Sequence, residues 1–173
     1  MTARYDEFVV KSFKGQSSFI DVTNEVREFV QQSGVHEGIC TVATTHTTCA
    51  VFLEEYTHDE DSQGVDYLSV DLERVLTKLV PRHSSKDSYL YPGEKHYRAV
   101  ESWPNAEDYL PGGDRTLLFN GDAHIKATII GESVTIPIKG SKLTLGTTGY
   151  VYFADFDQTQ ERKRKVQVVV IGE

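Results

Sequence analysis

The chain has 173 residues, of which 39% are hydrophobic and 25% are charged, as is usual for one folded globular domain. Its formal net charge of −8 argues against non-specific binding to nucleic acid, which needs a basic surface. The same charge still permits a small anion held by a few local cations. No long apolar run occurs, so the sequence predicts neither a signal peptide nor a membrane span.

The only two cysteines, Cys40 and Cys49, lie in the same predicted strand region. A disulfide between them would require that strand to fold back on itself. Reduced thiols in a cytoplasmic protein are therefore the expectation.

The first third of the chain predicts strands and one helix. Residues 8–13 and 17–21 read as two strands joined by a turn around Gly15. A helix follows, which Asp21 or Thr23 can cap and which Gly34 ends. From Gly38 onward, a β-branched run predicts a buried strand that continues to two carboxylates at its end.

The middle of the chain predicts a loop over 57–64, a helix over 65–80 and a long irregular segment over 82–115. The helix carries one apolar stripe, formed by Val65, Leu68, Leu72, Val75, Leu76 and Leu79. The irregular segment contains the only tryptophan, Trp103, and several tyrosines. Because disordered segments are poor in aromatic residues, we expect an ordered loop that covers a pocket.

The last third predicts a short helix from Asn120 to Ile130, followed by strands only. The predicted strands are 133–138, 142–145, 150–156 and 164–171. The total is about seven strands and three helices, segregated along the chain rather than alternating. This order favours an α+β fold made of one domain, residues 1–173.

The long predicted strand has an unusual centre, Thr44-Thr45-His46-Thr47-Thr48. A strand that places a histidine among hydroxyls gives up apolar burial for hydrogen-bonding and ligand groups, as functional sites do. Thr47 and Thr48 are therefore candidate substrate-binding residues. The alternative is a core strand whose histidine is hydrogen-bonded and inert.

Three histidines are candidates for a metal site, namely His46, His96 and His124, with His83 in reserve. Three protein nitrogens and one open position form the usual catalytic zinc site. His124 would lie in the first turn of a helix, which disfavours the protonated ring. The three are far apart in sequence, however, and three unrelated histidines are the alternative.

Charged residues supply the other candidates. Glu55 and Asp71 could act as acid or base near a metal-bound water, or could chelate Mg²⁺. Lys126 and Arg162, with Arg164, could hold a phosphate. The alternatives are a solvated helix residue for Asp71 and a charged strand edge for the arginines.

Several segments resemble the YjbQ-like family, also called the secondary thiamine-phosphate synthase family. The resembling segments are Thr45-His46-Thr47-Thr48-Cys49-Ala50-Val51 with Glu55, the helix from Asp71 to Pro81, Asn120-Gly121-Asp122-Ala123-His124-Ile125-Lys126-Ala127, and Phe156-Asp157 with Arg162. They span most of the chain in the family's order. One departure is Gly146-Thr147-Thr148-Gly149, where the family commonly has Gly-Thr-Trp-Gln.

The resemblance implies a two-sheet β-sandwich, a homotrimer and a histidine-lined pocket with a divalent metal, zinc or magnesium. It places His46 and His124 among the ligands, with His96 as the third. It also implies a side activity in making thiamine phosphate.

Two functional hypotheses follow. In the first, the protein is a metal-assisted, transferase-type enzyme acting on a small phosphorylated molecule. In the second, it is a non-catalytic trimeric protein that binds a metal or a ligand. Apolar strands at 150–153 and 166–171 add an independent argument for a trimer, because a half-exposed strand would alternate more cleanly. The alternative is that both strands are central and covered within one chain.

Overall fold

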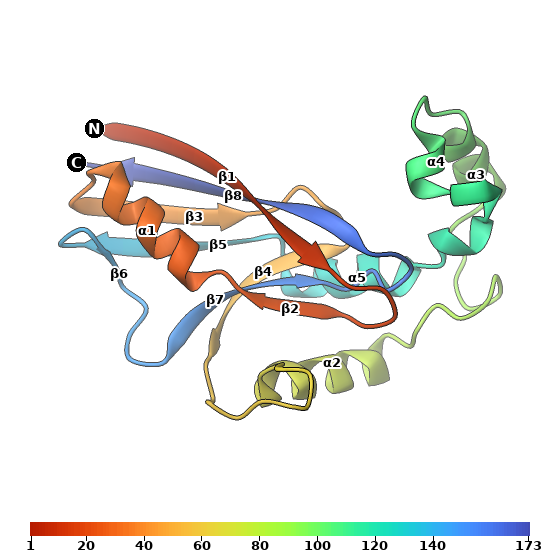
Figure 1. Cartoon of the computed structure of the whole chain (residues 1–173), viewed down its shortest axis with the longest axis horizontal. Helices are drawn as coiled ribbons and strands as arrows, with labels where there is room; N and C mark the ends of the chain where they lie inside the picture. The colour runs from red at the N-terminus through yellow and green to blue at the C-terminus, as the bar shows by residue number, and fades with distance from the viewer.

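The computed structural model describes all 173 residues and consists of two antiparallel sheets with five α-helices (Figure 1). The strands are β1 (Thr2–Ser12), β2 (Ser18–Asp21), β3 (Glu37–Ala43), β4 (Cys49–Glu55), β5 (Ser133–Lys139), β6 (Lys142–Leu143), β7 (Gly149–Asp155) and β8 (Arg162–Gly172). The helices are α1 (Thr23–Ser33), α2 (Tyr67–Leu79), α3 (Glu94–Glu101), α4 (Ala106–Tyr109) and α5 (Gly121–Ile130). Two 3₁₀ turns, η1 (Pro111–Gly113) and η2 (Arg115–Leu118), precede α5.

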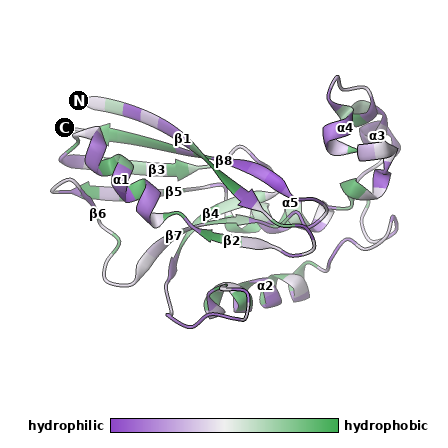
Figure 2. Ribbon diagram, viewed as in Figure 1, coloured by the Kyte–Doolittle hydropathy of each residue, from purple (hydrophilic) through white to green (hydrophobic).

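The two sheets share one apolar core. The five-stranded sheet has the order β1-β8-β3-β5-β6, and the three-stranded sheet has the order β2-β7-β4. Inward side chains of both sheets pack with one face of α1 in a single cluster, including Val26, Val42, Phe153 and Val168. In Figure 2 the strand β3 and the C-terminal part of β8 are accordingly mostly hydrophobic, the start of β8 is hydrophilic, and the edge strand β1 alternates. The other face of the three-stranded sheet packs against α5 and α2.

The predicted strand from Gly38 to Glu55 is two strands that belong to different sheets. β3 pairs with β5 and β8, whereas β4 pairs with β7. Residues 44–48 make the crossing between them. There the Thr44 hydroxyl donates to the carbonyl of Lys165, and the Cys49 amide donates to the carbonyl of His46. Polar side chains interrupt the strand here because they satisfy backbone groups that a ladder would otherwise pair.

The crossing also explains why the two cysteines lie on different strands. Cys40 lies on β3 and Cys49 on β4, so they do not share a strand, and both are buried free thiols. Burial raises the pKa of the Cys40 thiol to about 12, which keeps it protonated and unreactive.

The helix count exceeds the expected three because the segment at 82–115 contains the helices α3 and α4. There are eight strands rather than about seven, since the strand predicted from Gly38 to Glu55 is divided into β3 and β4. Residues 94–118, hereafter the helical insert, contain α3, α4, η1 and η2 and lie to one side of the sheets (Figure 1). A small core of Val100, Leu110 and Leu118 holds the insert together. Arg115 adds hydrogen bonds to Glu94 and to Glu101.

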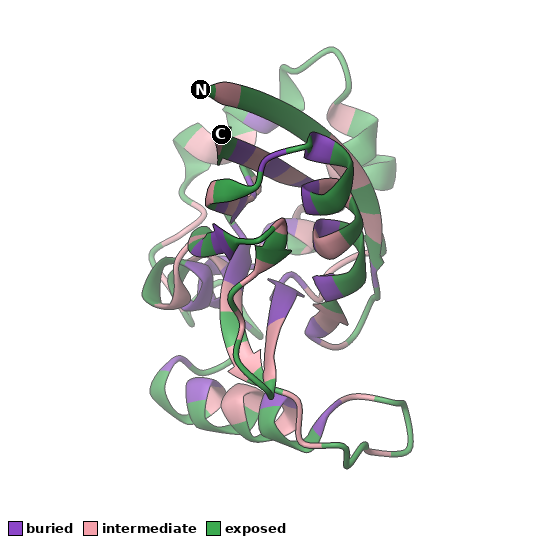
Figure 3. Ribbon diagram, turned by 90° about the vertical axis from the view of Figure 1, so that its left-hand side faces the viewer, coloured by how far each residue is buried: buried purple, intermediate pink, exposed green.

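The apolar stripe of α2 is less buried than its pattern predicts. Only Leu76 is fully buried, whereas Leu68, Val75 and Leu79 are 39%, 57% and 68% exposed. Figure 3 shows this helix at the bottom of the view with few buried residues. None of the helices is both long enough and apolar enough to span a membrane.

Strands β7 and β8, in contrast, are covered within the chain. Each lies between two neighbours in its sheet, and Val166, Val168 and Val170 are buried in the shared core. Their inner faces thus need no partner chain, whereas Ile171 on the outer face of β8 is 38% exposed, and the trimer stays a prediction.

Candidate functional site

A cleft of about 770 Å³ lies where the β3–β4 crossing, the start of β8, the first turn of α5 and the helical insert meet. Its size falls within the range of roughly 300–1,000 Å³ that is usual for small-molecule sites. We call it the histidine cleft, because His46, His96 and His124 all line it. The sequence prediction that these three side chains come together is thus matched by their position.

Four further predicted residues line the same cleft, namely Thr47, Thr48, Arg162 and Arg164. Thr47 and Thr48 are brought there by the crossing, and Arg162 begins strand β8. Long-range strand pairing, rather than sequence proximity, therefore assembles this side of the cleft.

His124 is held in one tautomer by the crossing. Its Nδ1–H donates to the carbonyl of Thr47 at 3.2 Å, which leaves Nε2 with a free lone pair. Burial lowers the pKa of His124, so the ring is neutral near pH 7. Its exposed lone pair can accept a hydrogen bond or a proton.

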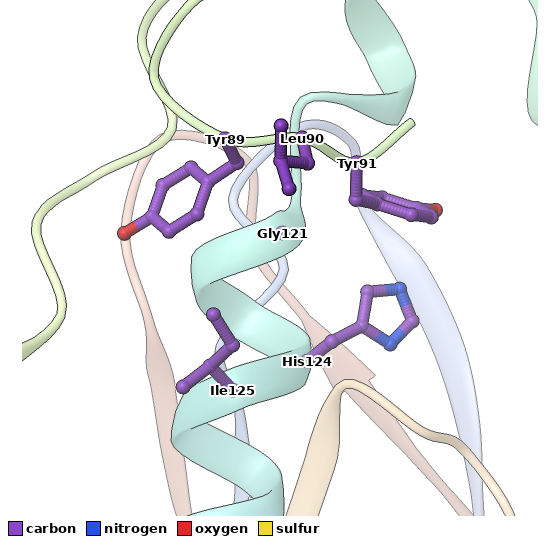
Figure 4. Close-up of a pocket in the computed structure, with 6 residues that line it drawn as sticks. All are labelled: Tyr89, Leu90, Tyr91, Gly121, His124 and Ile125. Atoms are coloured by element: carbon purple, nitrogen blue, oxygen red, sulfur yellow. The ribbon is translucent and has the colours of Figure 1, made fainter. Parts of the chain in front are cut away.

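Tyr91 packs edge-on against His124, with ring centroids 5.3 Å apart, and its hydroxyl lies 3.2 Å from Nε2 of His96. Burial raises the pKa of Tyr91 to about 12, so the phenol remains protonated. Figure 4 shows Tyr91 and His124 at a neighbouring apolar pocket of about 540 Å³ on the first turns of α5. Gly121 permits this packing, since a Cβ there would lie 3.4 Å from Tyr91 and 3.3 Å from His83.

His46 is oriented differently from His124. The backbone N–H of Lys165 donates to its Nε2 at 2.9 Å, so the neutral ring carries its proton on Nδ1. Burial, and next the guanidinium of Arg164, lower the pKa of His46. His46 lines the cleft, and Nδ1–H is the hydrogen-bond donor of its neutral ring.

A buried ion pair supports this side of the cleft. Asp155 is fully buried and accepts from Nε of Arg164 at 2.7 Å and from Nη2 at 3.3 Å. The same Nη2 donates to the Thr48 hydroxyl at 3.1 Å. These bonds fix the crossing to β7 and β8, because breaking any of them leaves a buried polar group without a partner.

Arg162 is less completely paired than Arg164. Its Nη1 donates to the carbonyl of Asp108 at 3.2 Å, and its Nη2 lies 3.8 Å from Asp157. Its Nε has no acceptor within the chain, although the side chain is only 15% exposed. Arg162 thus has donor capacity that the protein itself does not use.

Three predicted site residues lie outside the cleft. Glu55 is exposed at the end of β4, and Asp71 is exposed on α2 in an ion pair with Arg74. Lys126 is fully buried on the opposite side of α5, where its Nζ donates to Glu73 at 2.8 Å and to Thr77 at 2.9 Å. The helical period explains why Lys126 lies outside the cleft that His124 lines, since residues two apart on α5 face different directions.

The reserve histidine, His83, is also outside the cleft. Its Nδ1 accepts from the backbone N–H of Gly121 at 3.1 Å, and its ring stacks on Phe119. It therefore fastens the segment before the insert to the first turn of α5.

The donor set of one chain does not fit a divalent metal. No group of three or more His, Cys, Asp and Glu side chains is arranged to hold an ion. His46 already uses Nε2 on Lys165, and the Nε2 of His96 faces the hydroxyl of Tyr91. Only His124 has the free nitrogen and the carbonyl-bound Nδ1–H that metal ligands usually show. The zinc or magnesium expectation stays a prediction.

Sequence reasoning missed Tyr91, Asn120 and Asp155 as parts of this site. The signal for Asp155 was present, because an aspartate in the apolar run before Phe156 must be paired if it is buried. Asn120 was expected only as a helix cap, yet its Nδ2 bonds Asp157 at 3.3 Å. No pattern in the sequence pointed to Tyr91.

The fold and cleft define a class of α+β proteins with two antiparallel sheets and a small-molecule-sized site at one end. The chain matches a family model described as UPF0047 protein YjbQ-like over residues 7–173. It belongs to this YjbQ-like family, as the resemblance of its motifs predicted.

Relatives and solved structures agree with this assignment. A UPF0047 protein of Archaeoglobus fulgidus is 31% identical over 91% of this chain and 94% of its own. A crystal structure from Clostridium acetobutylicum, described as an uncharacterized YjbQ/UPF0047 family protein, is 30% identical, covers 96% of this chain and 99% of its own, and has a TM-score of 0.67. A Sulfolobus solfataricus structure, described as a YbjQ-like protein of unknown function, covers 99% of both chains at 22% identity and a TM-score of 0.70.

These findings correct the predicted activity. The similar proteins carry descriptions such as UPF0047 protein and protein of unknown function, and none is described as a thiamine-phosphate synthase or as any transferase. The prediction of a metal-assisted transferase was therefore wrong. Membership of the family therefore supports the fold of this chain but assigns no reaction to it.

Proposed function

We propose that the chain is a small-molecule-binding protein whose histidine cleft holds an oxyanion, a phosphate or carboxylate group. The observation that carries this proposal is Arg162, a guanidinium that lines the cleft and whose Nη2 makes no hydrogen bond within the chain, its nearest carboxylate oxygen being that of Asp157 at 3.8 Å. A planar guanidinium is the side chain best suited to carboxylate and phosphate oxygens.

Neighbouring groups support the same ligand chemistry. His46 presents Nδ1–H, and the Thr47 hydroxyl lines the cleft, so several donors surround one region. His124, neutral because burial lowers its pKa, presents an acceptor for a ligand hydroxyl or proton. The paired Asp155 fixes Arg164 in place without leaving the cleft strongly cationic, so binding depends on geometry more than on net charge.

Titration of the purified protein with methyl phosphate, acetate and uncharged glycerol tests this proposal. We expect the anions, but not glycerol, to bind by calorimetry and to raise the unfolding temperature, because a ligand of the folded state stabilises it by mass action. Arg162→Gln should weaken anion binding by about tenfold or more, since a charge-assisted hydrogen bond is worth roughly 1.5–3 kcal/mol.

Arg74→Gln is the matched control. Arg74 lies on α2 in an exposed pair with Asp71, so this substitution removes the same charge far from the cleft. It should leave binding unchanged. Failure of every anion to bind, or equal affinity in the wild type and Arg162→Gln, would contradict the proposal.

We also propose that the chain forms a homotrimer and resides in the cytoplasm. The exposed leucines and valine on α2 support association, since apolar stripes of this kind are uncommon on the free surface of monomers. The free buried thiols support a reducing compartment. Light scattering at micromolar concentration should give about three times the 19.5 kDa of one chain; a mass of one chain would contradict a trimer.

A further inference from the structure

The side of the histidine cleft that the helical insert forms is mainly apolar and aromatic, with His96 and Asp108 as its polar members. Val100, Trp103, Tyr109 and Leu118 line the cleft from the insert. Val100 and Leu118 are buried in the insert's own core. Trp103 is different: its indole stands edge-on to Tyr109, with centroids 5.1 Å apart, yet 41% of the residue is exposed. The small core thus leaves much of the indole uncovered.

Arg162 joins this aromatic side to the charged side. Its guanidinium carbon lies 5.7 Å from the ring centroid of Tyr109, and its Nη1 donates to the carbonyl of Asp108. Gln160 donates to the carbonyl of Tyr109 at 2.9 Å. Side chains at and just before the start of β8 therefore hold the insert in place, and the aromatic residues lie next to the proposed anion-binding group.

The volume of the cleft also requires an explanation. About 770 Å³ is the space of a drug-sized molecule, far more than an inorganic anion fills. A ligand that reaches both sides would place its charge at Arg162 and its remaining atoms against Trp103 and Tyr109. Aromatic side chains favour rings there, through offset or edge-to-face contact.

We infer that the wall of Val100, Trp103 and Tyr109 is a subsite for a planar apolar group, so that the ligand of the cleft is an anion carrying an aromatic ring. This inference rests on the proposed function for the oxyanion end of the ligand. Trp103 is a specificity-determining residue that contacts the ring and leaves the anionic group to Arg162.

Two pairs of probes, each matched in charge, test the inference on the full chain by calorimetry: phenyl phosphate against methyl phosphate, and benzoate against acetate. We expect the aromatic member of at least one pair to bind about tenfold more tightly, as an aromatic contact together with buried ring area would give. The pair that responds distinguishes a phosphate from a carboxylate ligand. Trp103 is the only tryptophan, so the aromatic probe should also change the intrinsic fluorescence.

Variants separate the subsite from the rest of the cleft. Trp103→Ala should reduce the affinity of the aromatic probe to that of its small partner without affecting the partner, and Trp103→Phe should restore most of the difference. Tyr67→Ala removes an exposed aromatic side chain from α2 and should change neither affinity.

The outcomes distinguish the two proposals. Equal affinity within both pairs would overturn the inference while leaving the oxyanion site intact. Absence of binding by all four probes would overturn the oxyanion site and the inference with it. Equal loss of both members of a pair in Trp103→Ala would show a structural role for the indole and would also overturn the inference.

Discussion

The two sides of the histidine cleft are built in different ways. The sandwich side is continuous with the main core and is fixed by the buried ion pair of Asp155 with Arg164. The insert side has only a three-residue core, is held together by exposed ion pairs of Arg115, and is attached by hydrogen bonds from Gln160 and Arg162. A site built this way combines rigid polar groups with an apolar wall that can open at low cost.

Asp155→Ala tests how much the buried ion pair stabilises the sandwich side. The substitution removes the hydrogen-bonded carboxylate of Arg164 and leaves a guanidinium that is only 11% exposed with the more distant Asp157, at 3.6 Å, as its sole counter-charge. Because breaking a buried ion pair leaves an uncompensated charge, we expect a loss of about 3–5 kcal/mol in the free energy of unfolding. Urea unfolding followed by circular dichroism measures it.

Asp71→Ala is the control for that measurement, since its ion pair with Arg74 is exposed. Exposed pairs are worth roughly 0–1 kcal/mol, so the variant should unfold close to the wild type. If the two variants lost equal stability, burial would not distinguish the two kinds of pair.

The second prediction concerns His83, which connects the segment before the insert to α5, and its effect on stability as the pH changes. Burial lowers the pKa of His83, so the folded ring stays neutral while the unfolded ring takes up a proton below its usual pKa of 6.5. Asp122 opposes this shift to a smaller extent. The contribution of His83 to stability is therefore complete above pH 6.5 and is lost as the pH falls below that value.

His83→Phe keeps a ring against Phe119 but removes both the titrating group and the acceptor of the Gly121 N–H. We expect the variant to lose about 1–3 kcal/mol at pH 8, from the unsatisfied buried amide, and to lose less additional stability between pH 8 and pH 5 than the wild type. His36→Gln, which removes an imidazole that is 69% exposed, is the control for loss of a histidine and should unfold close to the wild type at pH 8. A profile for His83→Phe as steep as that of the wild type would contradict this assignment.

Sequence patterns predicted the sandwich side of the molecule better than the insert. Period-two alternation and β-branched runs identified most strands, and Gly34 ended α1 in a left-handed conformation as expected. The break between β3 and β4 was missed, because Thr44 to Thr48 are compatible with a strand, and only tertiary hydrogen bonds such as that from Thr44 to Lys165 favour the crossing.

In the candidate site too, some residues could be predicted from the sequence and others depended on tertiary contacts. His46, His124 and Arg162 were found from residue type and motif and do meet in the cleft, as does His96. The direction of Lys126 depends on which face of α5 packs against the sheet, and the apolar pattern of this short helix is nearly uniform around its axis. Trp103 was recognised as part of a covering segment, but its place in the same cleft as Arg162 depends on hydrogen bonds between residues 51 and 54 positions apart.

The smallest effect is expected from Arg115→Gln, which loosens the insert alone. Arg115 donates to Glu94 and to Glu101 and lies over the ring of Tyr97, and all these contacts are solvent-exposed. Salt screens such pairs, so the midpoint of global unfolding should hardly change. Amide hydrogen exchange should nevertheless become faster across residues 94–118 and stay unchanged in β3 and β8, because local opening of the insert does not require opening of the main core. Arg98→Gln, which removes only the exposed pair of Arg98 with Glu94 within α3, is the matched control and should accelerate exchange less. Faster exchange in β8 as well would mean that the two sides of the cleft open together, and the contrast between a rigid and a mobile side would then be wrong.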